Sequence, residues 1–372
     1  MTLLAATVLF SLPSADRPLI LAHVVPWFEA DPDAGRYGWH WTMDRFNPAA
    51  DPPTLASHYK PAIGPYDSGD RAVIEYHLLL MRAAGIDGVI VDWYGRTDLN
   101  DYAPLHRNTT RLLQECERLN MRFAVCYEDQ TVPKLVAAGR LAEADRVSHA
   151  AAEIDWLGRY WFRSGSYARV DAKPLLLSFG FGGLTADEWS RVLRRVQTPV
   201  AYFSQNAPRP GAAGAFDWPV PSKGLKAQAA FLRRAERMPA AIPAAYPRFH
   251  DVYAEAGVTA SYGRIPDGDG RTFRRTLARA VAGGAPVVQI VTWNDWGEGT
   301  QVEPSEAFGV RDLRAVQDVR RQLDAEFPFT ADDLAFPRRL LEARRLGTTP
   351  GLDEASAAFA AGEAETAAGA VP

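Results

Sequence analysis

Short apolar runs alternate along this chain with longer segments in which apolar residues recur at helical spacing. Short, β-branched apolar runs are typical of buried strands, and apolar residues three and four apart are typical of one face of a helix. The predicted strands are 18–25, 86–91, 122–126, 174–178, 199–203, 214–216, 240–245 and 286–292. The predicted helices are 70–84, 108–120, 132–138, 142–161, 185–196, 225–238, 272–282, 311–326 and 331–345.

This alternation of strands and helices predicts an α/β protein with a single (β/α)₈ TIM-type barrel over residues 16–350. A long aromatic-rich loop follows the first strand, and helices close the C-terminal side. An open doubly wound sheet is the alternative. The barrel is favoured because polar and aromatic residues cluster where the strands end, and in a barrel those ends meet on one face. Residues 351–372 form a tail rich in Ala, Gly and Glu, for which we expect poor order or weak helicity.

The charge and hydropathy of the chain limit the classes of partner that it is expected to bind. A net charge of −4 without any basic run gives no reason to expect nucleic acid or an anionic membrane, and no later segment predicts a membrane span. A polysaccharide or oligosaccharide is the expected substrate, and a monomer is the default oligomeric state. Residues 1–15 contain an apolar run with small residues after it but no basic residue before it. They favour a secreted or periplasmic protein if they are a signal segment, and a cytoplasmic one otherwise.

Metal and cofactor motifs are not found. The two cysteines, Cys116 and Cys126, fall in a helix pattern and a strand pattern, so two buried free thiols are expected. The histidines show no spacing typical of a metal site, and no glycine-rich nucleotide fingerprint follows a strand. The sequence therefore predicts neither a metal nor a cofactor.

The strongest chemical signal lies directly after the last predicted strand. There Asp295 and Glu298 stand three positions apart in the run W-N-D-W-G-E-G. Paired carboxylates can supply the acid and the base that cleave an acetal, and aromatic rings offer flat faces for sugars. We therefore predict Asp295 and Glu298 as catalytic residues, with Trp293, Asn294 and Trp296 contacting substrate.

Further candidates for substrate binding lie at other strand ends and, in the case of His23, inside the first predicted strand. These are His23, Trp27, Asp92, Trp93, Tyr94, Glu128 and Tyr246. For Asp92 and Glu128 the alternative is a salt bridge across the barrel mouth, and for His23 it is a hydrogen-bonded core histidine. Glu303, beyond the turn, is expected to support the site from behind.

Three blocks of this sequence resemble a known group of enzymes. W-N-D-W-G-E-G-T-Q-V-E-P (293–304), I-G-P-Y-D-S-G-D (63–70) and A-G-I-D-G-V-I-V-D-W-Y-G (84–95) are similar to glycoside hydrolase families 71 and 99. The resemblance runs from about residue 19 to residue 308, and it is diffuse between the blocks. It implies a (β/α)₈ barrel that acts on α-linked polysaccharides or glycans.

The resemblance also implies roles. In family 99, the endo-α-mannosidases, the first carboxylate of the motif acts on the sugar 2-hydroxyl and the second is the general acid/base, which would correspond to Asp295 and Glu298. Here the first residue is one methylene shorter than the family's Glu, and Gly297 replaces a His. Asp295, Gly297 and Glu298 match family 71, which cleaves α-1,3-glucan, whereas residues 299–301 match family 99. The sugar, the linkage, the stereochemistry and endo or exo action stay open.

Two functions of different classes fit this sequence. One is a glycoside hydrolase, endo-acting by expectation, that uses carboxylate acid/base catalysis. The other is a non-catalytic carbohydrate-binding barrel with the same aromatic cleft, which the fold alone does not exclude. The intact Asp295 and Glu298 pair favours the enzyme.

Overall fold

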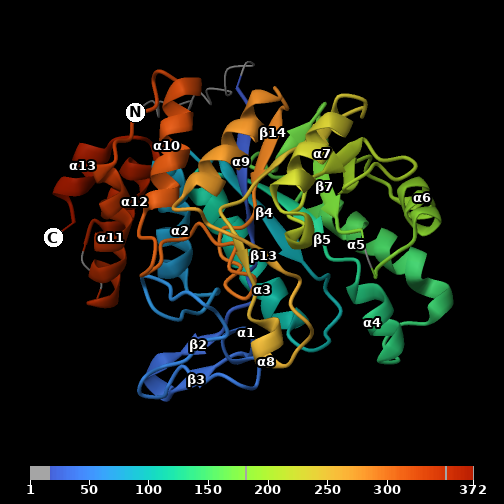
Figure 1. The fold of residues 1–372 in the computed structure, drawn as a ribbon, viewed down its shortest axis with the longest axis horizontal. Helices are drawn as coiled ribbons and strands as arrows, with labels where there is room; N and C mark the ends of the chain where they lie inside the picture. The colour runs from blue at the N-terminus through green and yellow to red at the C-terminus, as the bar shows by residue number, and fades with distance from the viewer. Residues whose placement is uncertain (1–16, 181, 348–349, 372) are drawn as a thin grey trace, which may run out of the picture.

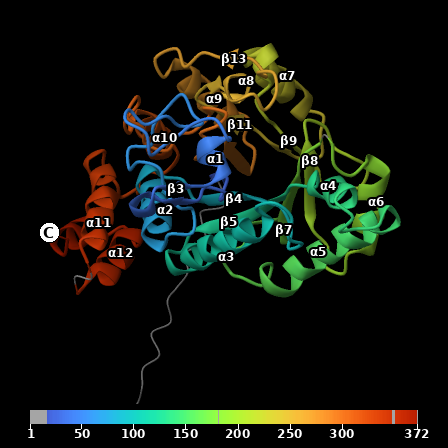
Figure 2. The same ribbon diagram turned by 90° about the horizontal axis from the view of Figure 1, so that it is seen from below.

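The computed structural model describes residues 17–180, 182–347 and 350–371. The predicted signal-like segment 1–15 lies outside the described residues. At the centre, parallel strands form one sheet that curves into a barrel (Figures 1 and 2). These strands are β1 (Leu19–Val24), β4 (Gly88–Trp93), β5 (Arg122–Tyr127), β7 (Lys173–Ser178), β8 (Ala201–Gln205), β9 (Gly214–Phe216), β10 (Ala241–Ile242), β11 (Ala244–Ala245) and β14 (Val287–Ile290).

The barrel closes through a strand that proline interrupts. The sheet order is β10-β9-β8-β7-β5-β4-β1-β14-β11, and β10 and β11 are consecutive in the chain on either side of Pro243. Proline has no backbone N–H to donate to a ladder, so it divides one extended segment into two short strands. Its carbonyl still accepts from the Gln289 N–H at 2.9 Å. With β10 and β11 taken as one strand, the eight predicted strands are present and the predicted TIM-type fold is confirmed.

Helices surround the barrel (Figure 2). They are α2 (Arg71–Ala84), α3 (Tyr102–Arg118), α4 (Thr131–Ala137), α5 (Arg146–Tyr160), α6 (Ala186–Arg195), α7 (Leu225–Ala235), α9 (Arg271–Ala282), α10 (Arg311–Leu323) and α11 (Phe336–Arg345). Single 3₁₀ turns occupy Pro32–Ala34, Glu143–Asp145, Pro221–Lys223 and Asp332–Ala335. Helix α6 begins at the predicted cap, where Thr185 and Glu188 form a reciprocal capping box. Helix α3 begins earlier than predicted because a proline in its first turn is tolerated there.

Two apolar layers result from the alternation of side chains along the strands. One fills the barrel interior and includes Leu21, Ile90, Cys126, Leu177 and Phe203. The larger layer lies between the outer face of the barrel and the helices. Because side chains at the carboxyl ends of the strands lie above the interior layer, they are free to line a site.

The insertions gather at one end of the barrel, which is the lower end in Figure 1. The loop after β1 carries β2 (Ala30–Asp31), β3 (Arg36–Tyr37) and α1 (Trp39–Thr42). The connection from β11 to β14 carries β12 (Phe249–His250), α8 (Tyr253–Ala256) and β13 (Arg264–Ile265). A further short strand, β6 (Arg169–Val170), pairs antiparallel with β7. The long loop after β1 is ordered in part by a hydrogen bond from the Trp41 indole to the Tyr66 carbonyl at 2.9 Å.

The C-terminal helices lie beside α2 (Figure 1). The Ala/Gly/Glu-rich tail forms α12 (Leu352–Ala360) and α13 (Ala364–Gly369). Arg344 of α11 donates to Glu75 of α2 at 2.6 Å and to Asp353 of α12 at 2.6 Å, so one guanidinium joins three helices. Within the described ranges, no helix has the length and apolarity needed to cross a membrane.

Candidate active site

A cavity of about 620 Å³ opens at the carboxyl ends of the strands. The predicted site residues that line it are His23, Trp27, Asp92, Tyr94, Glu128, Asp295 and Glu298. They come from β1, β4, β5 and the turn after β14, which are distant in sequence and adjacent in the barrel. The structure therefore brings both predicted catalytic carboxylates into one cavity.

The turn that carries this pair is held by its own hydrogen bonds. The Thr292 hydroxyl accepts from the Asp295 N–H at 2.8 Å and lies 2.9 Å from the Thr300 hydroxyl across the turn. Oδ1 of Asp295 in turn accepts from the Glu298 N–H at 3.0 Å. Gly299 follows at φ 66°, a conformation that glycine adopts without strain. Asp295 is thus fixed in position, while the Glu298 carboxylate remains free to reach a ligand.

The two carboxylates have different acidities. Burial raises the pKa of Asp295 to about 6, although backbone N–H groups of the turn oppose the shift. Burial and the neighbouring Asp295 charge raise the pKa of Glu298 well above its usual range. Oε2 of Glu298 is buried without a hydrogen-bond partner among the described residues. At neutral pH this favours an ionised Asp295 beside a protonated Glu298, the arrangement needed for one base and one acid.

A second acidic pair, Asp92 and Glu128, lines the same cavity. Burial, with Glu128 and Asp295 close by, raises the pKa of Asp92 well above its usual range. Burial and the Asp129 charge raise the pKa of Glu128 to about 7. The alternative of a salt bridge here is not seen, because no described residue that lines the cavity is Lys or Arg.

His23 lines the same cavity, and its imidazole is the weakly basic kind that stays neutral at neutral pH. Burial lowers the pKa of its imidazole to about 3, and the neighbouring Gln289 only partly opposes this. Together with Asp92 and Cys126 it also forms, within the described residues, a group of ligand atoms suited to a metal ion.

Five predicted substrate contacts lie outside the cavity lining. They are Trp93, Tyr246, Trp293, Asn294 and Trp296, each 2% exposed or less. Trp93 points outward from the barrel, where its indole donates to His106 at 3.1 Å and packs against Trp156 and Trp161. Tyr246 belongs to a separate apolar cluster. Trp93 lies outside the cavity because side chains alternate between the two faces of a strand, so its ring points away from the face that carries Asp92 and Tyr94.

The remaining three hold the turn in place from behind. The Asn294 amide accepts from the Val25 N–H at 2.9 Å and donates to the Val25 carbonyl at 3.0 Å, which ties the turn to β1. The Trp296 indole donates to Glu303 at 3.2 Å. Trp293 packs edge-on against a buried histidine. These side chains are buried behind the turn that carries Asp295 and Glu298.

Glu303 is buried behind the turn, as its place in the sequence suggests. It accepts from the Tyr66 hydroxyl at 2.7 Å and lies 3.1 Å from Nε2 of His77. Its contacts therefore join the long loop after β1, helix α2 and the turn after β14.

Several lining residues were not in the predicted set. They are Gln130, Phe179, Gln205, Asn206, Trp218, Tyr253 and Tyr262. Trp218 follows the weak strand β9, so its position at a strand end was a usable signal. Tyr253 and Tyr262 come from the insertion before β14, and no local pattern indicates that this insertion folds back over the barrel.

A second hollow of about 230 Å³ adjoins the first. The two share Trp27, Tyr94, Tyr253, Tyr262 and Asp295 in their linings. In the second hollow the Trp27 ring stacks on His40, with centroids 4.4 Å apart. Asp295 therefore stands where two adjoining spaces meet.

Comparison with known proteins supports the fold. No protein-family model and no curated protein matches the chain. Two structures of the GH99 endo-alpha-mannosidase from Bacteroides thetaiotaomicron, one in complex with BIS-TRIS-propane, superpose with a TM-score of 0.60 at 16% identity, covering 82% of this chain and 98% of that one. A glycoside hydrolase-like protein superposes with a TM-score of 0.58 at 12% identity, covering 82% of this chain and 95% of its own. At these identities the likeness establishes a shared barrel fold, in agreement with the family resemblance seen in the sequence.

Proposed function

We propose that this protein is a glycoside hydrolase that cleaves α-linked polysaccharide or glycan by carboxylate acid/base catalysis. The observation that carries this proposal is the placement of Asp295 and Glu298 in one rigid turn at one cavity, with Asp295 the stronger acid of the pair. Titratable pairs whose surroundings separate their pKa values are typical of catalytic sites.

Glu298 is the general acid in this proposal. Its raised pKa keeps the carboxyl protonated at neutral pH, so it can donate that proton to the departing glycosidic oxygen. Asp295, ionised under the same conditions, takes a proton from a water molecule or from the sugar 2-hydroxyl. The first route inverts the anomeric centre, and the second leads through a sugar-derived intermediate to retention.

The shape of the site supports internal cleavage of a polymer. Because the two hollows meet at Asp295, a chain of sugars can occupy both sides of the reacting bond. Trp27 and Tyr94, which line both hollows, offer aromatic faces for stacking beside that bond. We therefore propose endo action, with Trp218 and Tyr262 as further walls.

The proposed substrate class is supported by one similarity in sequence and one in structure. The motif 293–304 is intermediate between the α-mannan-type and the α-1,3-glucan-type enzymes, and the superposed Bacteroides protein is an endo-alpha-mannosidase. We propose α-mannan as the first substrate to test and α-1,3-glucan as the second.

Proton NMR of the anomeric region during digestion of both polymers tests the proposal. We expect new anomeric signals from one polymer, and the configuration of the first anomer distinguishes inversion from retention. Glu298→Gln should give no signal over the same period. The matched control is Glu255→Gln, because Glu255 lies on α8, outside the lining of both hollows. Saturable binding of a polymer without any product, by the unaltered protein, would contradict the enzyme and support the binding barrel.

A further inference from the structure

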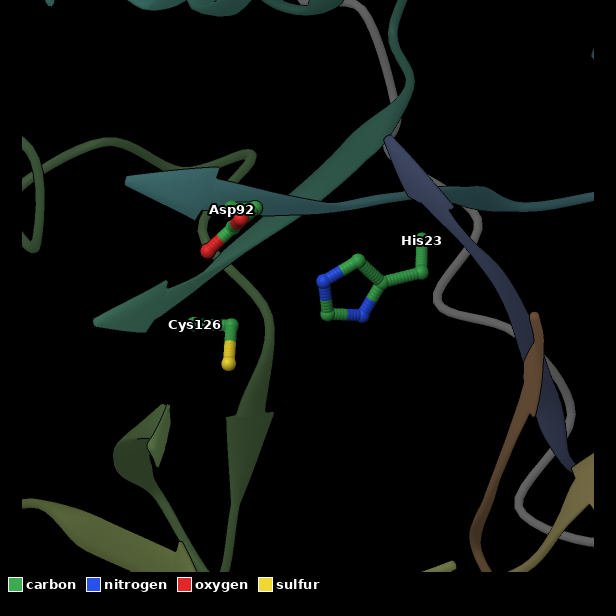
Figure 3. Close-up of side chains that lie close together, drawn as sticks. All are labelled: His23, Asp92 and Cys126. Carbon is green, nitrogen blue, oxygen red and sulfur yellow. The ribbon is translucent and has the colours of Figure 1, made fainter. Parts of the chain in front are cut away.

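Three potential metal ligands point into one space at the floor of the cavity. The ligand atoms of His23, Asp92 and Cys126 all lie within 4.8 Å of one another (Figure 3). All three residues are buried, and His23 and Asp92 also line the cavity. Figure 3 shows the imidazole directed toward the carboxylate and the thiol, each side chain coming from a different strand.

The barrel produces this arrangement from residues that are far apart in sequence. Asp92 of β4 and Cys126 of β5 are direct partners in the strand register, and β1, which carries His23, pairs with the other side of β4. All three side chains point inward because residues alternate between the two faces of a strand. Ligands on three separate strands leave no short motif in the sequence, which explains why the spacing of the histidines and cysteines predicted no metal.

Three buried polar atoms of this group have no hydrogen-bond partner among the described residues. They are the two ring nitrogens of His23 and Oδ1 of Asp92, although Gln289 lies close enough to the imidazole to oppose the lowering of its pKa. Buried polar atoms that are left without a partner destabilise the folded state. Such atoms persist where a ligand, an ion or water satisfies them, and here one ring nitrogen of His23 faces Asp92 and Cys126.

The carboxyl groups of the cavity also suit a cation, because a nearby cation favours their ionised forms. Four carboxyl groups line it, and the described lining contains neither Lys nor Arg. Burial and the adjacent carboxylates Asp92 and Glu128 raise the pKa of the Cys126 thiol well above its usual range. A bound dication would reverse that effect, because a coordinating thiol loses its proton to solvent as the metal–sulfur bond forms.

We propose that His23, Asp92 and Cys126 bind one divalent transition-metal ion, with Zn²⁺ as the leading candidate. A neutral imidazole, a thiolate and a carboxylate are all zinc ligands, and a thiolate disfavours Mg²⁺ and Ca²⁺. Tetrahedral zinc needs ligand atoms about 3.5 Å apart, given bonds of about 2.0–2.3 Å, so small side-chain rotations bring the three into range. The fourth position faces the cavity, where water or a sugar hydroxyl can occupy it. This proposal does not depend on the proposed hydrolysis.

Cobalt substitution tests the site without an activity assay. The full chain is stripped with a chelator and titrated with Co²⁺, and the absorbance of the cobalt–thiolate charge-transfer band is followed in the near ultraviolet. We expect a band that saturates at one Co²⁺ per chain and disappears when one equivalent of Zn²⁺ is added. The absence of such a band in the folded protein would overturn the proposal.

The chain supplies its own matched control for the thiol. Its two cysteines are both buried and free, and Cys116 lies on α3 outside this group. Cys126→Ser should abolish the charge-transfer band and weaken Zn²⁺ binding by about 100-fold or more, whereas Cys116→Ser should leave both unchanged. A band that survives in Cys126→Ser, or is lost in Cys116→Ser, would contradict the assignment.

A second variant covers the case in which Cys126→Ser does not fold. Asp92→Asn retains size and polarity but removes the charge, and we expect about 10–100-fold weaker Zn²⁺ binding with the thiolate band still present. Unchanged Zn²⁺ affinity in this variant would overturn the proposed ligand set. A protein that cleaves polymer yet binds no metal would refute this site alone, and one that binds metal yet cleaves nothing would refute only the hydrolase.

Discussion

Two glutamates in this barrel show how the same side chain becomes structural in one place and reactive in another. Glu75 lies on α2 beneath the C-terminal helices, and Glu298 lies in the turn at the cavity. Burial acts on both and tends to raise the pKa of each. At Glu75, hydrogen bonds and charge from Arg344 and Arg118 outweigh burial, and the pKa falls below its usual range. At Glu298 the nearest charges are carboxylates, so the pKa rises.

The pKa values of Glu75 and Glu298 shift in opposite directions because their neighbouring groups differ, although both carboxyl groups are buried. Glu75 receives hydrogen bonds from Arg118 and Arg344, each at 2.6 Å, and so remains a fixed anion that joins helices. One buried oxygen of Glu298 has no hydrogen-bond partner among the described residues, and the neighbouring carboxylate of Asp295 raises its pKa. A buried carboxyl without a cation holds a proton that it can give away.

The largest predicted effect separates the two glutamates by activity. Glu298→Gln should lower kcat by about 10²–10⁴-fold, because it removes the general acid, while the melting temperature does not fall. Glu75→Gln should leave kcat unchanged and destabilise the fold by about 1.5–3 kcal/mol, since charged hydrogen bonds are lost. Steady-state kinetics and thermal melts of both variants check this. Equal losses of activity in the two variants would remove the distinction.

Two tryptophans extend the comparison to the aromatic residues. Trp93→Ala should cost about 3–5 kcal/mol of stability, because it empties a packed layer between the barrel and the helices. Trp27→Ala should raise KM by on the order of tenfold with little change in stability, because its ring faces both hollows. Denaturant unfolding and KM measurements on the two variants provide the check. A raised KM in a well-folded Trp93→Ala would place that ring at the substrate after all.

The same residues show what the sequence could predict. Eight apolar runs were enough to give the barrel, and the convergence of strand ends placed Asp92, Glu128, Asp295 and Glu298 at one face. The sequence was also enough to predict that Trp93 points outward. Trp93 directly follows Asp92 in the strand, and consecutive side chains point to opposite faces.

Other features depend on contacts that no local pattern contains. The insertion with Tyr253 and Tyr262 reaches the cavity only through tertiary folding. The Trp296 indole is buried against Glu303 and the Tyr66 hydroxyl, to which it donates at 3.2 and 3.3 Å, and the contact with Tyr66 joins segments that are far apart in the sequence. The group of His23, Asp92 and Cys126 requires the order and register of three strands, which the sequence does not encode at short range.

The smallest predicted effect concerns stability and pH. The folded pKa of Glu298 lies above that of the unfolded chain, so the folded state holds its proton more tightly. The stability that this carboxyl contributes is therefore fully present below the ordinary glutamate pKa of about 4.3, and it is lost as the pH rises above that value toward the folded pKa. Glu298→Gln should consequently melt at a higher temperature than the unaltered protein at pH 7, and the difference should shrink at pH 4. Calorimetry of both proteins at pH 7 and pH 4 provides the check. A difference in melting temperature that is the same at the two pH values would argue against a raised pKa of Glu298.

The pH dependence of kcat/KM tests the central claim most directly. Asp295 must be ionised and Glu298 protonated, so activity should rise through an acidic limb near the pKa of about 6 and fall through a basic limb above neutral pH. Because the two groups interact, the limbs report the pair as a whole. An acidic limb near about 4, the ordinary value for an aspartate or glutamate, or a profile that is flat through neutral pH, would contradict the assignment of Asp295 and Glu298 as base and acid.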